Sequence, residues 1–140
     1  MDLQIASISL TGDRKNNEDY ANFVSGNAGA VLVVADGLGG REFGEWASEA
    51  FTEGVLAQQA LLLAGDYSSR EAAKPVFDKA FVDATDHLRD AVRARDETAD
   101  PQTTAVVAVI TEQAIGIGHI GDSRAYRLTP SGVTWRSRDH

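Results

Sequence analysis

Two helical patterns in the middle of the chain are flanked on both sides by segments of strand character. Apolar side chains recur at helical spacing in residues 42–63 and again in residues 74–95, so each segment can bury one face. The strand-type runs cover residues 3–10, 21–25, 30–35, 103–111, 114–120, 123–128 and 133–136. Strands grouped before and after the helices, rather than alternating with them, predict an α+β fold in which helices pack on an antiparallel sheet.

The chain has the length and charge of a single acidic domain. Its 140 residues predict one domain, residues 1–140, and 21 acidic against 13 basic residues give a net charge of −8. Nucleic acid is therefore an unfavourable partner, because phosphate binding needs clustered Lys and Arg. The chain has no cysteine, its first residues lack the pattern of a signal peptide, and its apolar runs are too short for a bilayer. We expect a cytoplasmic protein without a membrane span.

The run Val31–Ala35 is apolar at every position, which predicts a central strand covered on both faces. Gly26-Asn27 separates it from the preceding strand, so a hairpin is expected. The second helix is harder to bound. Ser68 and Glu71 resemble a capping box, but Pro75 would then fall inside the helix, which favours a start near Pro75.

Three polar loops could carry chemistry. The first, at residues 14–19, combines Arg14 with Glu18 and Asp19, which could hold a hard cation and an oxyanion side by side. A solvated turn is the alternative at this segment. An EF-hand is excluded because Lys15 would occupy a ligand position of the calcium loop.

The other two loops place an acid next to a strand. Asp36-Gly37 follows the apolar run directly, so its carboxylate and an accessible glycine carbonyl could both bind a metal; a glycine-rich turn is the alternative. Asp122 lies in the tight connection at residues 121–126, where a routine turn is again the alternative. A Ser-His-Asp hydrolase is disfavoured, because Ser123 has no histidine at a recognisable motif spacing.

Taken together and in order, these segments resemble the metal-dependent protein phosphatases of the type 2C (PPM) family, in the bacterial Ser/Thr form. The resemblance spans the whole chain. The segments that carry it are residues 12–19, 34–40, 103–105, 121–126 and 138–140. It implies a layered antiparallel β-sandwich flanked by helices, of which this chain is expected to be the N-terminal portion, incomplete at the C-terminus, because the family domain continues past Asp139-His140.

The resemblance also implies an activity: hydrolysis of phosphoserine and phosphothreonine in proteins by a metal-activated water at a binuclear Mn²⁺ or Mg²⁺ centre. Arg14 matches the arginine that holds the substrate phosphate, and Asp36 matches the acid that bridges two metals. The remaining metal ligands implied are Glu18, Asp19, Gly37 through its carbonyl, and Asp122 at an additional weaker position. Leu38 stands where some members place a histidine that serves as a general acid.

The expected partners are phosphorylated proteins and a cognate Ser/Thr kinase. An alternative function is a catalytically inactive, truncated or pseudophosphatase domain that acts as a metal- or protein-binding module. If strands of the second half are missing, those near residues 31–35 or 103–110 would expose edges and an apolar face, which favours self-association. A generic acidic α+β domain with accidental motif matches is the remaining alternative.

Overall fold

The computed structural model describes residues 2–38, 43–100 and 102–139. Its elements combine antiparallel strands with packed helices, which confirms the α+β class. In chain order they are β1 (Asp19–Gly26), β2 (Gly29–Asp36), α1 (Gly44–Ala57), α2 (Gln59–Leu63), α3 (Arg70–Arg93), β3 (Ala105–Ile110), β4 (Ile115–Ile120), β5 (Tyr126–Thr129) and β6 (Gly132–Arg136).

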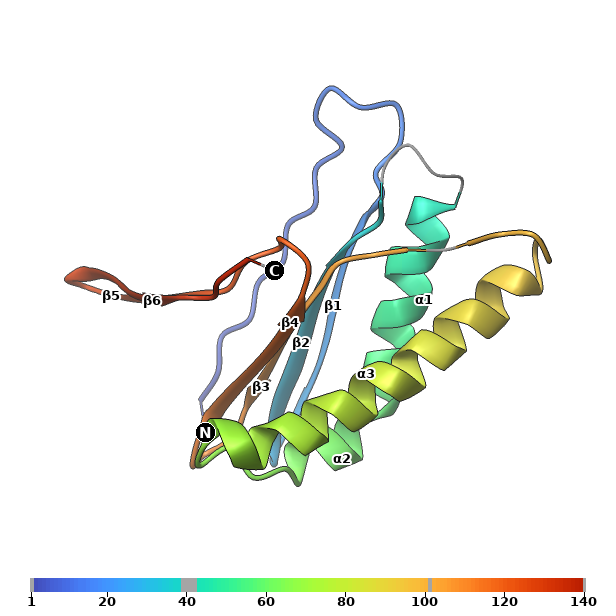
Figure 1. The fold of residues 1–140 in the computed structure, drawn as a ribbon. Coiled ribbons are helices and arrows are strands. Elements are labelled where there is room, and N and C mark those ends of the chain that lie inside the picture. Colours follow the sequence, from blue (N-terminus) through green and yellow to red (C-terminus); the bar gives the residue numbers. More distant parts are fainter. Residues whose placement is uncertain (1, 39–42, 101, 140) are drawn as a thin grey trace.

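Four strands form one antiparallel sheet in the order β1-β2-β3-β4, and β5 and β6 form a separate hairpin. The predicted first hairpin is confirmed, since β1 and β2 pair from Asp19–Asp36 to Gly26–Gly29. Figure 1 shows the β5–β6 hairpin extending away from the four-stranded sheet. The prediction that the strands near residues 31–35 or 103–110 have exposed edges was wrong. These strands, β2 and β3, each pair on both sides, and the outer strands of this sheet are β1 and β4.

The three helices cover one face of the four-stranded sheet (Figure 1), and the core lies between them and the strands. Phe51 of α1 and Leu62 of α2 are fully buried against the inward side chains Val31, Val33 and Val107. The opposite face is open: Val34 is 49% exposed and Phe23 is 38% exposed. The prediction that residues 31–35 are covered on both faces was therefore wrong for the outer face of β2.

The helices differ from their predicted bounds at two places. Gln58 has non-helical backbone angles, so the single helix expected over residues 42–63 is divided into α1 and α2. Helix α3 begins before Pro75, because the Ser69 hydroxyl accepts the Ala72 N–H at 3.1 Å and caps the first turn. Glu71 in that turn also interacts favourably with the helix dipole, which offsets the backbone hydrogen bond that Pro75 cannot make.

The opening segment was predicted to form a strand, but residues 2–10 are not part of any sheet. This segment instead lines a cavity of about 330 Å³ with residues 19–23 of β1 and 32–34 of β2, so it lies against the open face. Two large apolar residues of the segment stay exposed there, since Ile8 is 79% and Leu10 is 74% exposed. Among the described residues, none of the helices is long and apolar enough to cross a membrane.

Candidate functional site

The loop before β1 and the end of β2 form a polar cavity of about 160 Å³. Antiparallel pairing explains why they meet: Asp19 begins β1, Asp36 ends β2, and the two are register partners. The cavity brings together four of the predicted site residues, which are Arg14, Glu18, Asp19 and Asp36. Figure 1 shows this loop and the end of β2 near the first turn of α1.

The carboxyl groups of Asp19 and Asp36 interact directly. Partial burial raises the pKa of Asp36 above its ordinary value, and the charge of Asp19 and a hydrogen bond with its side chain raise this pKa further. The charge of Asp122 adds to the increase, whereas Arg14 opposes it. The fold without a cation therefore disfavours the charge on Asp36 relative to an ordinary aspartate, and a bound cation would favour that charge.

Glu18 is held in place through its backbone. Its carbonyl accepts the Gly37 N–H at 3.0 Å and the hydroxyl of Ser48, a buried residue of α1, at 2.6 Å. A Cβ at Gly37 would lie 2.0 Å from the carbonyl oxygen of Gly44, so the close approach of β2 to α1 requires glycine there. The Glu18 carboxyl carbon lies 3.1 Å from where a Cβ on Gly44 would be, which places this side chain against the start of α1.

Asp36 is fixed from the other side by the residues before β3. Its carbonyl accepts the Thr104 N–H at 2.8 Å and the Thr103 hydroxyl at 3.0 Å. Its own N–H donates to the Thr104 hydroxyl at 3.2 Å. Neither Thr104 nor Ser48 is among the site residues predicted from the sequence. Adjacent threonines before a buried strand, and a serine within the apolar stripe of a helix, are the signals that could have pointed to them.

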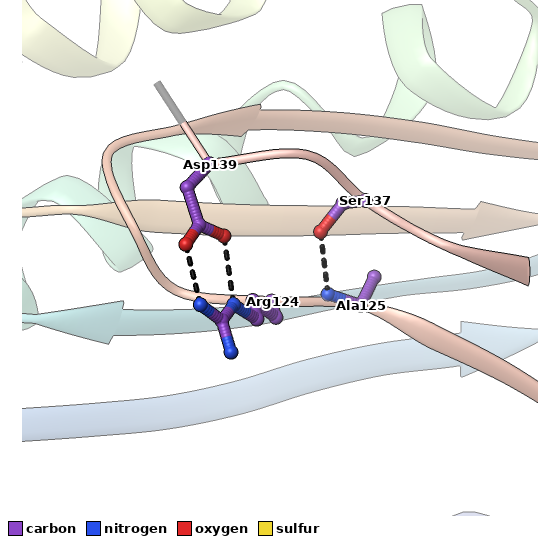
Figure 2. A network of polar contacts seen from close by, with 4 residues as sticks. All are labelled: Arg124, Ala125, Ser137 and Asp139. Atoms are coloured by element: carbon purple, nitrogen blue, oxygen red, sulfur yellow. Dashed lines mark hydrogen bonds and ion pairs between the residues drawn. The ribbon is translucent and has the colours of Figure 1, made fainter.

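Asp122 lies outside the lining of the cavity, in the turn between β4 and the β5–β6 hairpin. That turn is held by the end of the described chain, because Arg124 forms an ion pair with Asp139 and the Ala125 N–H donates to the Ser137 hydroxyl at 3.0 Å (Figure 2). Asp122 is nevertheless close enough for its charge to affect Asp36. The structure therefore brings Asp122 into the neighbourhood of the cavity.

The chemistry of the donors fits a hard divalent cation, because two carboxylates meet at one end of the sheet and the charge of Asp19 disfavours the ionised form of Asp36. Within the described ranges, no group of three or more His, Cys, Asp or Glu side chains is arranged to hold a metal ion. A cation bound by Asp19 and Asp36 would therefore also need backbone oxygen or water as ligands. Gly39, Gly40 and His140, which belong to the segments of family resemblance, lie outside the described residues.

Comparisons with known proteins agree with one another. The family model described as Protein phosphatase 2C matches residues 10–135. Among solved structures, serine/threonine phosphatase Stp1 from Staphylococcus aureus is 26% identical, with a TM-score of 0.71 over 90% of this chain and 49% of that one. Serine/threonine phosphatase PstP/Ppp from Mycobacterium tuberculosis is 30% identical, with a TM-score of 0.60 over 90% of this chain and 48% of that one.

The curated relatives are longer than this chain. A relative from Mycoplasma pneumoniae is 28% identical over 96% of this chain and 54% of its own length. One from Mycoplasma genitalium is 29% identical over 91% of this chain and 50% of its own length. The chain therefore spans about half the length of the curated relatives it matches.

Proposed function

The chain belongs to the protein phosphatase 2C family, and on that premise we propose that residues 1–140 form part of one phosphatase domain that hydrolyses phosphoserine and phosphothreonine in proteins with Mn²⁺ or Mg²⁺. The observation that carries the proposal is the cavity that brings Asp19 and Asp36 together with the Arg14 guanidinium. Burial first, and then the neighbouring carboxylates of Asp19 and Asp122, raise the pKa of Asp36 there. Such a combination of acids and a cation suits a site for metal ions and a phosphate group.

Arg14 is proposed to bind the substrate phosphate. Its guanidinium is close enough to lower the pKa of Asp36, and it lines the same cavity as the acids. A guanidinium can donate two parallel hydrogen bonds to phosphate oxygens and is always charged, which gives both orientation and affinity. A phosphate bound here would also offset the positive charge with which Arg14 lowers the pKa of Asp36.

Asp36 and Asp19 are proposed as the principal metal ligands, with Glu18 binding directly or through water and the Gly37 carbonyl as a further oxygen donor. Asp122 is proposed for an additional, weaker position. When two divalent cations are bound in such a site, they acidify a water molecule and neutralise phosphoryl charge, which is the chemistry that phosphate ester hydrolysis needs. The protein contributes rigid placement, because the Asp36 backbone is hydrogen-bonded to Thr103 and Thr104, and the N–H of the next residue, Gly37, donates to the Glu18 carbonyl.

Calorimetric titration with Mn²⁺ tests the metal site on the chain as it stands. We expect saturable uptake that is lost in Asp36→Asn and weakened at least about tenfold in Asp19→Ala. Asp90→Asn is the matched control, because Asp90 is an exposed acid on α3, remote from the polar cavity. Equal uptake by Asp36→Asn and the control would overturn the assignment of Asp36.

Hydrolysis of a phosphothreonine peptide, with and without Mn²⁺, tests the reaction. Arg14→Ala is expected to raise KM more than it lowers Mn²⁺ affinity, because its proposed contact is with the phosphate.

A second function, a non-catalytic metal- or protein-binding module, is supported by the absence of a three-acid metal cluster among the described residues and by the length of the relatives. Mn²⁺ uptake without any Asp36-dependent hydrolysis would favour that module.

The proposed partners follow from the reaction. Phosphorylated proteins are the substrates, and a Ser/Thr kinase supplies them. We also propose that the chain associates with itself through its open apolar sheet face, where Phe23 and Val34 are exposed.

A further inference from the structure

Thr104 lies directly before β3 and is 9% exposed. It makes two hydrogen bonds with the Asp36 backbone: its N–H donates to the Asp36 carbonyl at 2.8 Å, and its hydroxyl accepts the Asp36 N–H at 3.2 Å. The partners are 68 positions apart in the sequence. The backbone of a proposed metal ligand is therefore held by the backbone and the side chain of one residue that is distant in the sequence.

The same side chain also contacts the turn that contains Asp122. The Thr104 hydroxyl shares a hydrogen bond of 2.6 Å with the Ser123 hydroxyl. On the other side of Asp122, a Cβ at Gly121 would lie 2.7 Å from the Thr104 methyl carbon Cγ2. Gly121 has a φ of +85°, so both the backbone conformation and the contact favour glycine there. The residues before and after Asp122, Gly121 and Ser123, thus both lie beside the Thr104 side chain.

These contacts use both branches of the threonine side chain. The hydroxyl contacts Asp36 and Ser123, whereas the methyl group occupies the space that a side chain at Gly121 would need. Serine would keep only the hydroxyl, and valine would keep only the shape. The two functions of this side chain can therefore be separated by conservative substitutions.

We propose that Thr104 is a positioning residue that links the carboxylate-bearing end of β2 to the turn around Asp122, so that Asp36 and Asp122 are held as one unit. This inference rests on the proposed function, because it assigns to Thr104 the task of setting the relation between two proposed metal ligands. Thr104 itself contributes no ligand. It acts through hydrogen bonds that orient the residues that do.

Two readouts test this role, and one of them needs no metal. The first is amide hydrogen exchange at Asp36 and across residues 121–124. Thr104→Val removes the acceptor of the Asp36 N–H, so exchange at both places should become faster, whereas Thr104→Ser should protect Asp36 as the native residue does. The matched control is Thr111→Val, since the Thr111 hydroxyl accepts backbone N–H groups beyond the other end of β3.

The second readout is Mn²⁺ affinity by calorimetry. Thr104→Val is expected to weaken binding about 10–100-fold, as is typical for residues that orient metal ligands. Ser123→Ala should weaken it less, and Thr104→Val combined with Ser123→Ala should be no weaker than Thr104→Val alone, because both changes break one connection. Thr111→Val should bind Mn²⁺ as the native chain does.

The outcomes separate this inference from the proposed function. If Thr104→Val leaves exchange at residues 121–124 unchanged, the link between the two segments is overturned whether or not metal binds. If exchange changes as expected but the native chain takes up no Mn²⁺, the metal function fails and Thr104 is shown to connect the segments only. If Thr104→Val binds Mn²⁺ like Thr111→Val, its role toward the metal ligands is overturned. If Thr104→Val does not fold, comparing Thr104→Ser, which keeps the hydroxyl, with Ser123→Ala, which removes its partner, still tests the hydrogen bond between the two hydroxyls.

Discussion

Arg124 and Asp139 form a two-pronged ion pair in which the Arg124 Nε donates to Asp139 Oδ1 at 2.7 Å and a second guanidinium nitrogen donates to Oδ2 (Figure 2). Beside it, the Ser137 N–H donates to the Ala125 carbonyl at 3.0 Å. Together these contacts close the base of the β5–β6 hairpin. Since Arg124 is two residues after Asp122, they also fix one end of the turn that contains this acid.

The ion pair makes part of the stability sensitive to acid. Hydrogen bonding from Arg124 holds the pKa of Asp139 below its ordinary value of 3.8. A group with a depressed pKa contributes stability above its unfolded pKa and loses it as the pH falls through the folded value. Arg124→Gln should therefore raise the Asp139 pKa in a carboxyl NMR titration and reduce the loss of stability below about pH 4 in urea unfolding.

Arg89→Gln on α3 is the control for that titration, because Arg89 is paired with Asp86 and lies on another element. It should leave the Asp139 pKa unchanged. An Asp139 carboxyl that titrates at its ordinary pKa in the native chain would contradict the importance of the ion pair.

The acidic pair at the cavity should reduce stability when no metal is present. Because the raised pKa of Asp36 means that its charge is disfavoured in the fold, Asp36→Asn should increase the Tm of the metal-free chain at pH 7 by a few degrees. Added Mn²⁺ should raise the Tm of the native chain further at each higher concentration above its Kd, and should not stabilise Asp36→Asn. Thermal unfolding with a chelator and then with Mn²⁺ measures both effects, and a lower Tm for metal-free Asp36→Asn would refute the repulsion.

Helices α1 and α3 pack closely at Gly54. A Cβ there would lie 2.8 Å from the Cα of Ala84, which is backbone that cannot move without shifting α3. Gly54→Ala should therefore lower the free energy of unfolding, because overpacking costs about 1–3 kcal/mol and helix propensity returns only roughly 1 kcal/mol. Urea unfolding gives the value. Gly26→Ala, where nothing lies within 4 Å of the added carbon, is the control and should have a much smaller effect.

The open sheet face should drive self-association. Light scattering of the native chain is expected to show dimers or larger species at micromolar concentration, and a double variant with Phe23→Thr and Val34→Thr should be shifted toward monomer. Val82→Thr is the control, because Val82 is 58% exposed on α3, away from this face. A native chain that stays monomeric at every concentration would rule out this use of the face.

Much of the secondary structure could be predicted because it depends on local patterns. Alternation and apolar runs located β1 to β4, and the apolar stripe from Phe77 to Val92 located the buried face of α3. The incorrect secondary-structure predictions also have physical causes. The break at Gln58 interrupts a continuous helical pattern, and the strand expected at residues 3–10 has no pairing partner in the described structure. Neither feature has a local sequence signal.

Only some residues of the candidate site could be predicted from the sequence. The acids and Arg14 could be identified from residue type and order, since hard cations and phosphates require such groups. Thr104 and Ser48 could not be, because their importance comes from partners on other elements: Asp36 and Ser123 for the threonine, and the Glu18 carbonyl for the serine. The metal roles of the site residues stay predictions until Mn²⁺ binding is measured.

The sequence by itself determined the family, the α+β class and the chemical groups available to the site, because these depend on residue type and on spacing along the chain. Only the tertiary structure decided which strands lie at the sheet edges, which sheet face is open and how Asp36 is held against Asp19 and the Asp122 turn. Those properties depend on hydrogen bonds between residues far apart in the chain, as in the 68-position separation of Asp36 and Thr104. Such bonds exist only once the antiparallel register has brought the strand ends together.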